Sequence, residues 1–373
     1  MRRSIWLPAL AVCVGAAAYG AMAPAGRGPA RASRSYQRGD GDPRPQEIPA
    51  SARRPRLRAV RELGDSLAFA FVQDLSLVDG RLLVLDASAR HPVTTVDPAT
   101  GRVEQGYGQR GPGPGEFLWL RGAEPAGGRQ VWLNDLQAGR MTLYDLSRPG
   151  GAVVRTLRTP VGLYQPLHLG DTLVSNGLFP GEILRFFVED GGELREVRRA
   201  APTPFGREVP DVAMILNRTT LAASPRRDRL VGAYFYANRL DFYDRHGRLT
   251  AVAAGPREFA PTYRVVPDPR EKMIRWVPTG ETRYGYVDVA ATDDRVYALF
   301  AGRPNGADTD RMAAFDGTEV HVFDWNGALL DVMPLDLPVG KIAVDAATHT
   351  LYGMRRDPYP VVVQFAPLPG DVL

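Results

Sequence analysis

The stretch DGRLLVLD (79–86) decides the fold, because its pattern returns five more times along the chain. A tight-turn pair, here Asp79-Gly80, is followed by a short run of strand-forming residues. Asp-Gly between such runs is a strong signal for a β-hairpin, since both turn residues need a positive φ. The other copies are GGRQVWLND (127–135), GDTLVSN (170–176), RDRLVGAYF (227–235), DDRVYALF (293–300) and THTLYGM (348–354).

The spacing of these copies indicates one repeated supersecondary unit. Their first strand residues are separated by 48, 43, 57, 66 and 55 residues, which suits a four-stranded unit with loops of variable length. Strand-like segments also flank the turns, such as VQDLSLV (72–78) before the first and LDFYD (240–244) after the fourth. The second strands are apolar at consecutive positions, as in 82–85, so both of their faces must be covered.

The two ends of the repeat region explain each other. The sixth copy stops after its third strand, VVVQF (361–365), whereas LRAVRELG (57–64) resembles a fourth strand with nothing to pair with. If the N-terminal strand completes the last unit, a ring closes and no sheet edge is left open. The sequence therefore predicts an all-β fold over residues 57–373: a six-bladed β-propeller of four-stranded antiparallel blades, with the last blade closed by the N-terminal strand.

Charge is distributed unevenly along the chain. The net charge is +4, but the first 60 residues alone carry eleven arginines and only three acidic residues. The remainder holds 35 basic and 39 acidic residues, so the ring itself is mildly acidic. A body of this sign has no surface for tracking phosphates, and we expect no nucleic-acid partner.

The N-terminus has the pattern of an export signal. Arg2 and Arg3 precede an apolar run up to about Ala23, and we interpret residues 1–23 as a signal peptide. A retained membrane anchor, or a lipid on Cys13, remains the alternative. Residues 24–56 are rich in Pro, Gly and Arg, which predicts a disordered basic linker; contact of this basic tail with anionic lipid, close to a membrane, is the alternative. We therefore expect an exported protein, periplasmic, extracellular or envelope-associated.

Two segments resemble known families. GQRGPGPGEF (108–117) resembles the blade-connecting loop of bacterial NHL-type six-bladed propellers. The stretch from YGYVDV (284–289) to RVYALFAG (295–302) looks like the TolB-like six-bladed family. The resemblance implies a six-bladed ring over roughly residues 57–366, of a kind that is mostly exported and acts in binding or scaffolding. It implies no shared catalytic motif.

Candidate binding residues follow from the expected position of each strand. The innermost strands and the ends of the second strands should bring polar groups to the central channel: Asp74, Glu124, Asn134, His168, Asn176, Asp288 and Asp345. Carboxylates and amides of this kind are oxygen ligands that suit calcium. Equally, they are the polar or turn residues that any propeller carries, and a shift of one residue in a strand reverses which side chain meets the channel.

The long segment 256–283 interrupts the repeat and offers a second candidate surface. Arg264, Arg275 and Trp276 have the composition of an interaction site, although the loop could equally pack its own apolar residues onto the ring. No catalytic residue is predicted, since no nucleophile elbow, phosphate loop or metal-ligand spacing is present. We interpret the chain as a non-enzymatic monomer, without a cofactor, that binds a protein, peptide or glycan. The alternative is a calcium-dependent lactonase or esterase that uses the channel carboxylates.

Overall fold

The computed structural model describes residues 34–35, 42–50, 56–64, 69–160, 162–207, 210–268, 273–304 and 315–368. The expected signal peptide, with Cys13, lies outside these residues. The chain divides into residues 1–32 and a compact unit from Ser33 to Leu373. Every strand of the propeller belongs to this second unit.

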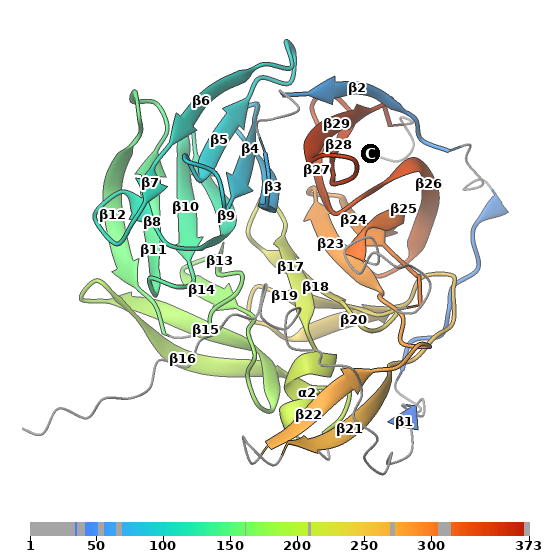
Figure 1. The fold of residues 1–373 in the computed structure, drawn as a ribbon. Coiled ribbons are helices and arrows are strands. Elements are labelled where there is room, and N and C mark those ends of the chain that lie inside the picture. Colours follow the sequence, from blue (N-terminus) through green and yellow to red (C-terminus); the bar gives the residue numbers. More distant parts are fainter. Residues whose placement is uncertain are drawn as a thin grey trace, which may run out of the picture. The chain divides into compact units, whose positions relative to one another are not determined.

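The described residues of this unit form six blades of four antiparallel strands (Figure 1), and a single parallel pairing between the outermost strands, Arg158 with Glu193, joins the second and third blades into one eight-stranded sheet. The first three blades are β3 (Val72–Val78), β4 (Arg81–Asp86), β5 (Val93–Val96) and β6 (Val103–Tyr107); β9 (Leu120–Gly127), β10 (Gln130–Asp135), β11 (Arg140–Asp145) and β12 (Ala152–Arg158); and β13 (Leu167–Leu169), β14 (Thr172–Ser175), β15 (Glu182–Asp190) and β16 (Glu193–Pro202). The last three are β17 (Thr219–Ala223), β18 (Arg229–Tyr234), β19 (Leu240–Asp244) and β20 (Leu249–Ala253); β23 (Tyr286–Ala291), β24 (Arg295–Phe300), β25 (Gly317–Asp324) and β26 (Leu329–Val339); and β27 (Lys341–Asp345), β28 (Thr350–Arg355), β29 (Val361–Phe365) and β2 (Ala59–Leu63).

The N-terminal strand closes the ring, as the sequence predicts. In the sixth blade, β2 is the outermost strand and pairs with β29, with Leu63 opposite Val362. Leu57, just before β2, also bridges to Leu335 of the fifth blade. Figure 1 shows β2 beside β29, so the start of the described ring and its end meet in one sheet. The fold is therefore a closed six-bladed propeller.

Turn chemistry explains why the first two strands of each blade form hairpins. Asp79 and Gly80 have φ of 49° and 69°, the left-handed values that a two-residue hairpin requires. At the equivalent turn of the fourth blade, Arg227 adopts a φ of 60° without being glycine. The sequence predicts that both faces of the second strands are covered, and β4 confirms this: every residue after Arg81 is buried.

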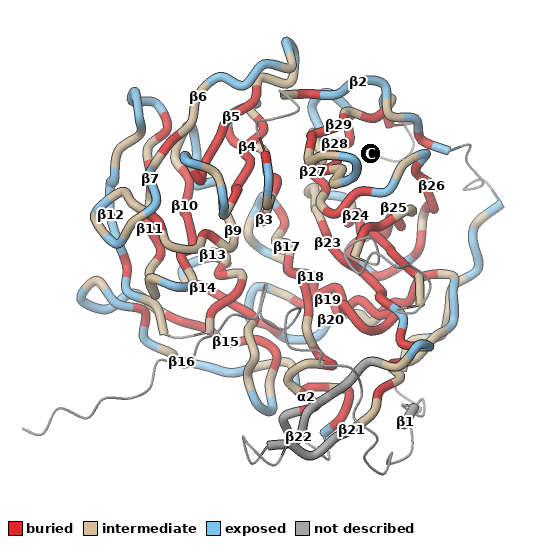
Figure 2. The backbone as a smooth tube through the Cα atoms, viewed as in Figure 1, coloured by how far each residue is buried: buried red, intermediate tan, exposed pale blue. Residues whose placement is uncertain are grey.

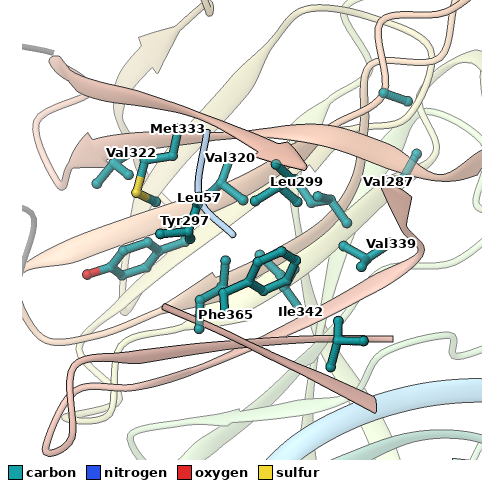
Figure 3. Packing of buried hydrophobic residues seen from close by; sticks show 14 of the residues in the cluster. Leu57, Val287, Tyr297, Leu299, Val320, Val322, Met333, Val339, Ile342 and Phe365 are labelled. Atoms are coloured by element: carbon teal, nitrogen blue, oxygen red, sulfur yellow. The ribbon is translucent and has the colours of Figure 1, made fainter. Parts of the chain in front are cut away.

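The core lies between the blades as a series of apolar clusters, and the buried backbone follows the inner strands around the ring (Figure 2). The largest cluster joins the fifth and sixth blades. Figure 3 shows Tyr297, Leu299 and Val320 of the fifth blade packing towards Ile342 and Phe365 of the sixth. Because this cluster includes residues of both sheets, the last blade is fixed by side-chain packing as well as by β2.

Smaller elements decorate the ring. The segment 256–283 contains a hairpin of β21 (Thr262–Asp268) and β22 (Met273–Pro278), to which β1 (Arg34–Ser35) adds a third strand. A short helix, α2 (Pro210–Leu216), packs against β22. The parallel pair β7 (Gln109–Arg110) and β8 (Glu116–Phe117) brackets the glycine- and proline-rich run between the first two blades.

The expected linker, residues 24–56, differs from the prediction in its second half. Residues 42–50 lie against the fourth and fifth blades rather than free of the ring. Gln46 donates to the carbonyls of Ala254 and Gly327 and accepts from the backbone N–H of Leu329. The composition of this segment, rich in Pro and Gly, predicts disorder and gives no sign that a single side chain, Gln46, forms three hydrogen bonds to the ring.

Candidate functional site

A cavity of about 810 Å³ lies where the six innermost strands approach one another. Residues of β3, β9, β13, β17, β23 and β27 all line it, and Figure 1 places these strands around the centre of the ring. Much of the wall consists of small or aliphatic residues, such as Ala222, Ala290 and Val344. Charged side chains are few and each has a specific position, which is the usual make-up of a ligand pocket.

Four polar residues each connect one blade to the next by a hydrogen bond. Each lies on or just before an innermost strand, and its side-chain oxygen accepts a backbone N–H of the following blade's innermost strand. The four bonds are Asp74 to Ala123 (2.8 Å), Glu124 to His168 (2.8 Å), Gln165 to Leu221 (3.0 Å) and Asp288 to Ile342 (2.9 Å). These groups are therefore held rigidly by the scaffold, with one oxygen of each committed to it.

A lysine compensates the carboxylates on one side of the channel. Lys341 Nζ lies 3.0 Å from Asp288 Oδ1, and both side chains are largely buried. Burial raises the pKa of Asp74, and the nearby Lys341 opposes that rise. The positive charge of Lys341 therefore stabilises the ionised forms of Asp74 and Asp288, which burial would otherwise disfavour.

On the other side of the cavity, Glu124, His168 and Arg227 form one connected group. His168 Nδ1 lies 2.7 Å from Glu124 Oε2, and Arg227 forms an ion pair with the same carboxylate. The imidazole stacks on Trp132 at 5.3 Å between ring centroids, and burial lowers the pKa of His168. Because Glu124 is an acceptor, Nδ1 carries the proton and Nε2 is the acceptor nitrogen of the imidazole.

Arg227 reaches this group from the fourth blade. Its guanidinium also donates to the carbonyls of His168 (3.2 Å) and Pro125 (2.6 Å), which belong to the third and second blades. A left-handed φ on a non-glycine residue costs free energy, so the cross-blade contacts must outweigh it. The side chain is about 29% exposed and lines the cavity, so it narrows the channel while remaining reachable.

The remaining candidates fall into three groups. Asn134 and Asn176 are buried and donate to backbone carbonyls of the following blade or of the segment leading to it, at 3.0 Å to Leu163 and 2.7 Å to Thr219. Asn134 lines the cavity and Asn176 does not. Asp345 lies outside the cavity, which corrects its predicted channel position: its carboxylate accepts from the N–H of Ala347 and caps the turn after β27.

Of the insertion residues, Arg264 is described and does not line the cavity. Arg264 lies in β21 with its backbone opposite Val277 of β22. The backbones of Arg275 and Trp276 lie in β22, but their side chains are outside the described residues. The surface predicted for this insertion stays a prediction.

The donor set of the channel does not fit a calcium ion. Among the residues that the structure describes, no group of three or more His, Cys, Asp or Glu side chains converges to hold a metal. Glu124 is bound by Arg227 and His168, and Asp288 by Lys341, so cations of the protein already occupy the carboxylates. A calcium site needs six to eight oxygens around one point.

Sequence reasoning missed the cations of the channel. Arg121, Arg218 and Lys341 each lie at or next to the first residue of an innermost strand, where the strands enter the channel. These positions could have been found by aligning the starts of the six innermost strands through their spacing to the turn pairs. Such an alignment is a weak indication of a binding site, since a positive charge at a strand start belongs to no short sequence motif, whereas a carboxylate is readily interpreted as a metal ligand.

The geometry defines a six-bladed propeller whose central cavity has a largely apolar wall with a few polar groups, and comparisons with known proteins agree on the fold. Residues 204–347 match a family model described as TolB-like 6-blade propeller-like, which confirms the resemblance of residues 284–302 to that family. The chain is similar to a DUF4221 family member from Bacteroides vulgatus (9% identity, 86% of this chain and 98% of that one, TM-score 0.53). It is also similar to a putative exported protein from Bacteroides fragilis (10% identity, 88% and 98%, TM-score 0.51).

At such low identity, these structures show the fold alone. No curated protein sequence matches the chain. Among the described residues, no helix is both long and apolar enough to cross a membrane.

Proposed function

We propose that the chain is an exported, non-enzymatic binding module whose central cavity takes up a segment of a protein, peptide or glycan. The observation that carries the proposal is the cavity itself: about 810 Å³, lined by all six innermost strands. Its polar side chains, such as Asp74, Glu124 and Asp288, are held in place by hydrogen bonds to the neighbouring blade, as a ligand pocket requires. Export is supported by the N-terminal sequence and by a structural neighbour that is itself described as a putative exported protein.

The chemistry of the cavity supports binding over hydrolysis. An enzyme of the calcium-dependent lactonase type needs carboxylates free to hold the metal. Here Asp288 pairs with Lys341, and Glu124 pairs with both Arg227 and His168. Groups compensated in this way orient and recognise a ligand without activating water.

Gly122 offers a direct test. It lines the cavity, and a Cβ built on it meets nothing within 4 Å, so Gly122→Phe is chosen to introduce a bulky side chain at the cavity wall. Gly280 is equally open but lies outside the cavity lining, on an exposed turn, and Gly280→Phe is the matched control. Both variants should fold with an unchanged thermal midpoint.

The assay is capture of ligands from a phage-displayed peptide library and a printed glycan array. We expect the wild type and Gly280→Phe to capture the same ligands, and Gly122→Phe to lose them at least tenfold. Equal capture by both variants would place the ligand elsewhere and refute the proposal. Hydrolysis of lactones or phosphoesters by the purified chain, abolished by Asp288→Ala, would refute its non-enzymatic part.

A further inference from the structure

Two arginines lie at the end of the ring where the innermost strands begin. Arg121 is the second residue of β9, and Arg218 directly precedes β17. Each is only partly exposed, and the positive charge of Arg218 lies close enough to Arg121 to lower the pKa of its guanidinium. Because all six innermost strands start at this end, their first residues surround one opening of the ring.

Neither arginine has a carboxylate in direct contact among the described residues. Among the described residues, Arg121 donates only to the amide oxygen of Gln73 (3.1 Å), and Arg218 lies over the ring of Phe235 at 4.5 Å. No described carboxylate forms a salt bridge with either. Asp74 and Asp288 act on Arg121 from a distance, but Asp74 accepts the N–H groups of Ala123 and Leu75, and Asp288 pairs with Lys341.

A buried hydroxyl completes the cluster. Tyr164 is 8% exposed, and its Oη has no hydrogen-bond partner among the described residues. Both Arg121 and Arg218 lower the pKa of Tyr164 against the effect of burial, so the hydroxyl lies within reach of both charges. Buried tyrosine hydroxyls normally have a partner, and two like charges at one site are costly without an anion.

We infer that Arg121, Arg218 and Tyr164 form a binding site for an oxyanion group, a carboxylate or a phosphate, at the strand-start end of the channel. Guanidinium groups bind such anions through two parallel N–H bonds, and the tyrosine hydroxyl adds a third donor. The inference rests on the proposed binding function and deepens it, since it gives the channel's ligand an anionic group at this end.

Burial and the neighbouring Arg218 lower the pKa of Arg121 to about 10, in agreement with this geometry. The guanidinium stays charged at neutral pH, and the carboxylates that favour this charge, Asp74 and Asp288, act on it from a distance without forming a salt bridge. An arginine with a purely structural role would instead have a carboxylate or several carbonyls around it, as Arg227 has.

The test uses the purified full chain with inorganic phosphate and acetate as separate probes, at constant ionic strength. We expect a saturable rise of the thermal unfolding midpoint with one or both anions, because a ligand that binds only the folded state stabilises it. The anion that acts identifies its source: a response to acetate alone points to a carboxylate, and a response to phosphate alone points to a phosphate group. Arg121→Gln and Arg218→Gln should each weaken the effect at least tenfold.

The matched control is Arg158→Gln, which removes one positive charge from an exposed position on β12. It should respond to anions as the wild type does. Without anion, Arg121→Gln should unfold at or above the wild-type midpoint, since it relieves repulsion and keeps a group able to bond Gln73. Absence of a saturable shift with both anions overturns the inference, as does equal loss in Arg158→Gln.

The two proposals fail separately. If neither anion binds but Gly122→Phe still abolishes ligand capture, the channel is a binding site without this anion subsite. If anions bind through Arg121 but no peptide or glycan is captured, the subsite stands and the larger ligand proposal fails. Should Arg121→Gln not fold, Arg218→Gln and Tyr164→Phe carry the same test, each with weakened anion response.

Discussion

Replacing Lys341 by methionine tests whether the channel depends on internal charge compensation. Lys341 Nζ lies 3.0 Å from Asp288 Oδ1, and the two side chains are 14% and 8% exposed. Methionine keeps the apolar length of the side chain but leaves the Asp288 charge buried and unpaired. Breaking a buried pair in this way costs about 3–5 kcal/mol. For an m-value of about 3 kcal/mol/M, the urea midpoint should fall by roughly 1 M or more.

The double variant Lys341→Met/Asp288→Asn separates charge from packing. The amide introduced at position 288 can still accept the N–H of Ile342, so most of the lost stability should return. As a control, Arg158→Met breaks an ion pair whose side chains are 81% and 62% exposed, and it should leave the midpoint unchanged. The reasoning is refuted if Lys341→Met unfolds at the wild-type urea concentration, or if Asp288→Asn rescues nothing.

Three further predictions concern stability. Leu63 is fully buried in β2, whereas Val60 of the same strand is 59% exposed. In urea titrations, Leu63→Ala should lower the free energy of unfolding by about 2–5 kcal/mol and Val60→Ala should change it little. Equal effects of the two substitutions would contradict ring closure by β2. Burial lowers the pKa of His321 below its usual 6.5, so the unfolded chain takes up a proton first and the free energy of unfolding falls as pH drops below about 6.5. In urea titrations from pH 7 to 5, His321→Gln should flatten that fall, whereas His246→Gln at an exposed turn should not; identical slopes would refute this. Gln46→Ala should lower the thermal midpoint by removing three bonds to the ring, and an unchanged midpoint would show that residues 42–50 add no stability.

The fold could be read from the sequence because its signals are local and repeated. Pairs such as Asp79-Gly80 specify a turn from two residues alone, and six spaced copies specify a ring. Closure followed from two leftovers, the unpaired segment 57–64 and the incomplete last copy, and the pairing of Leu63 with Val362 confirms it. These inferences needed no knowledge of which side chain faces inward.

The site was less predictable because it depends on contacts between blades. Glu124 and His168 were both proposed for the channel, but their bond to each other joins positions 44 residues apart. Arg227 was recognised only as part of a turn, and its reach to the second blade depends on ring geometry. The channel position predicted for Asp345 was wrong for a local reason: its carboxylate accepts the N–H of Ala347 and caps the turn at the end of its own strand.

Closure of the ring by β2 is the claim on which the cavity and both proposals depend, and a single disulfide tests it. Arg61 of β2 lies opposite Gln364 of β29, and the chain has one cysteine, at position 13, that can be replaced by serine. In the variant Cys13→Ser/Arg61→Cys/Gln364→Cys, mild oxidation should link β2 to β29 within one molecule, which peptide mass spectrometry detects. The account predicts nearly complete intramolecular disulfide in the folded protein. Free thiols, or disulfides only between molecules, would show that β2 does not complete the sixth blade.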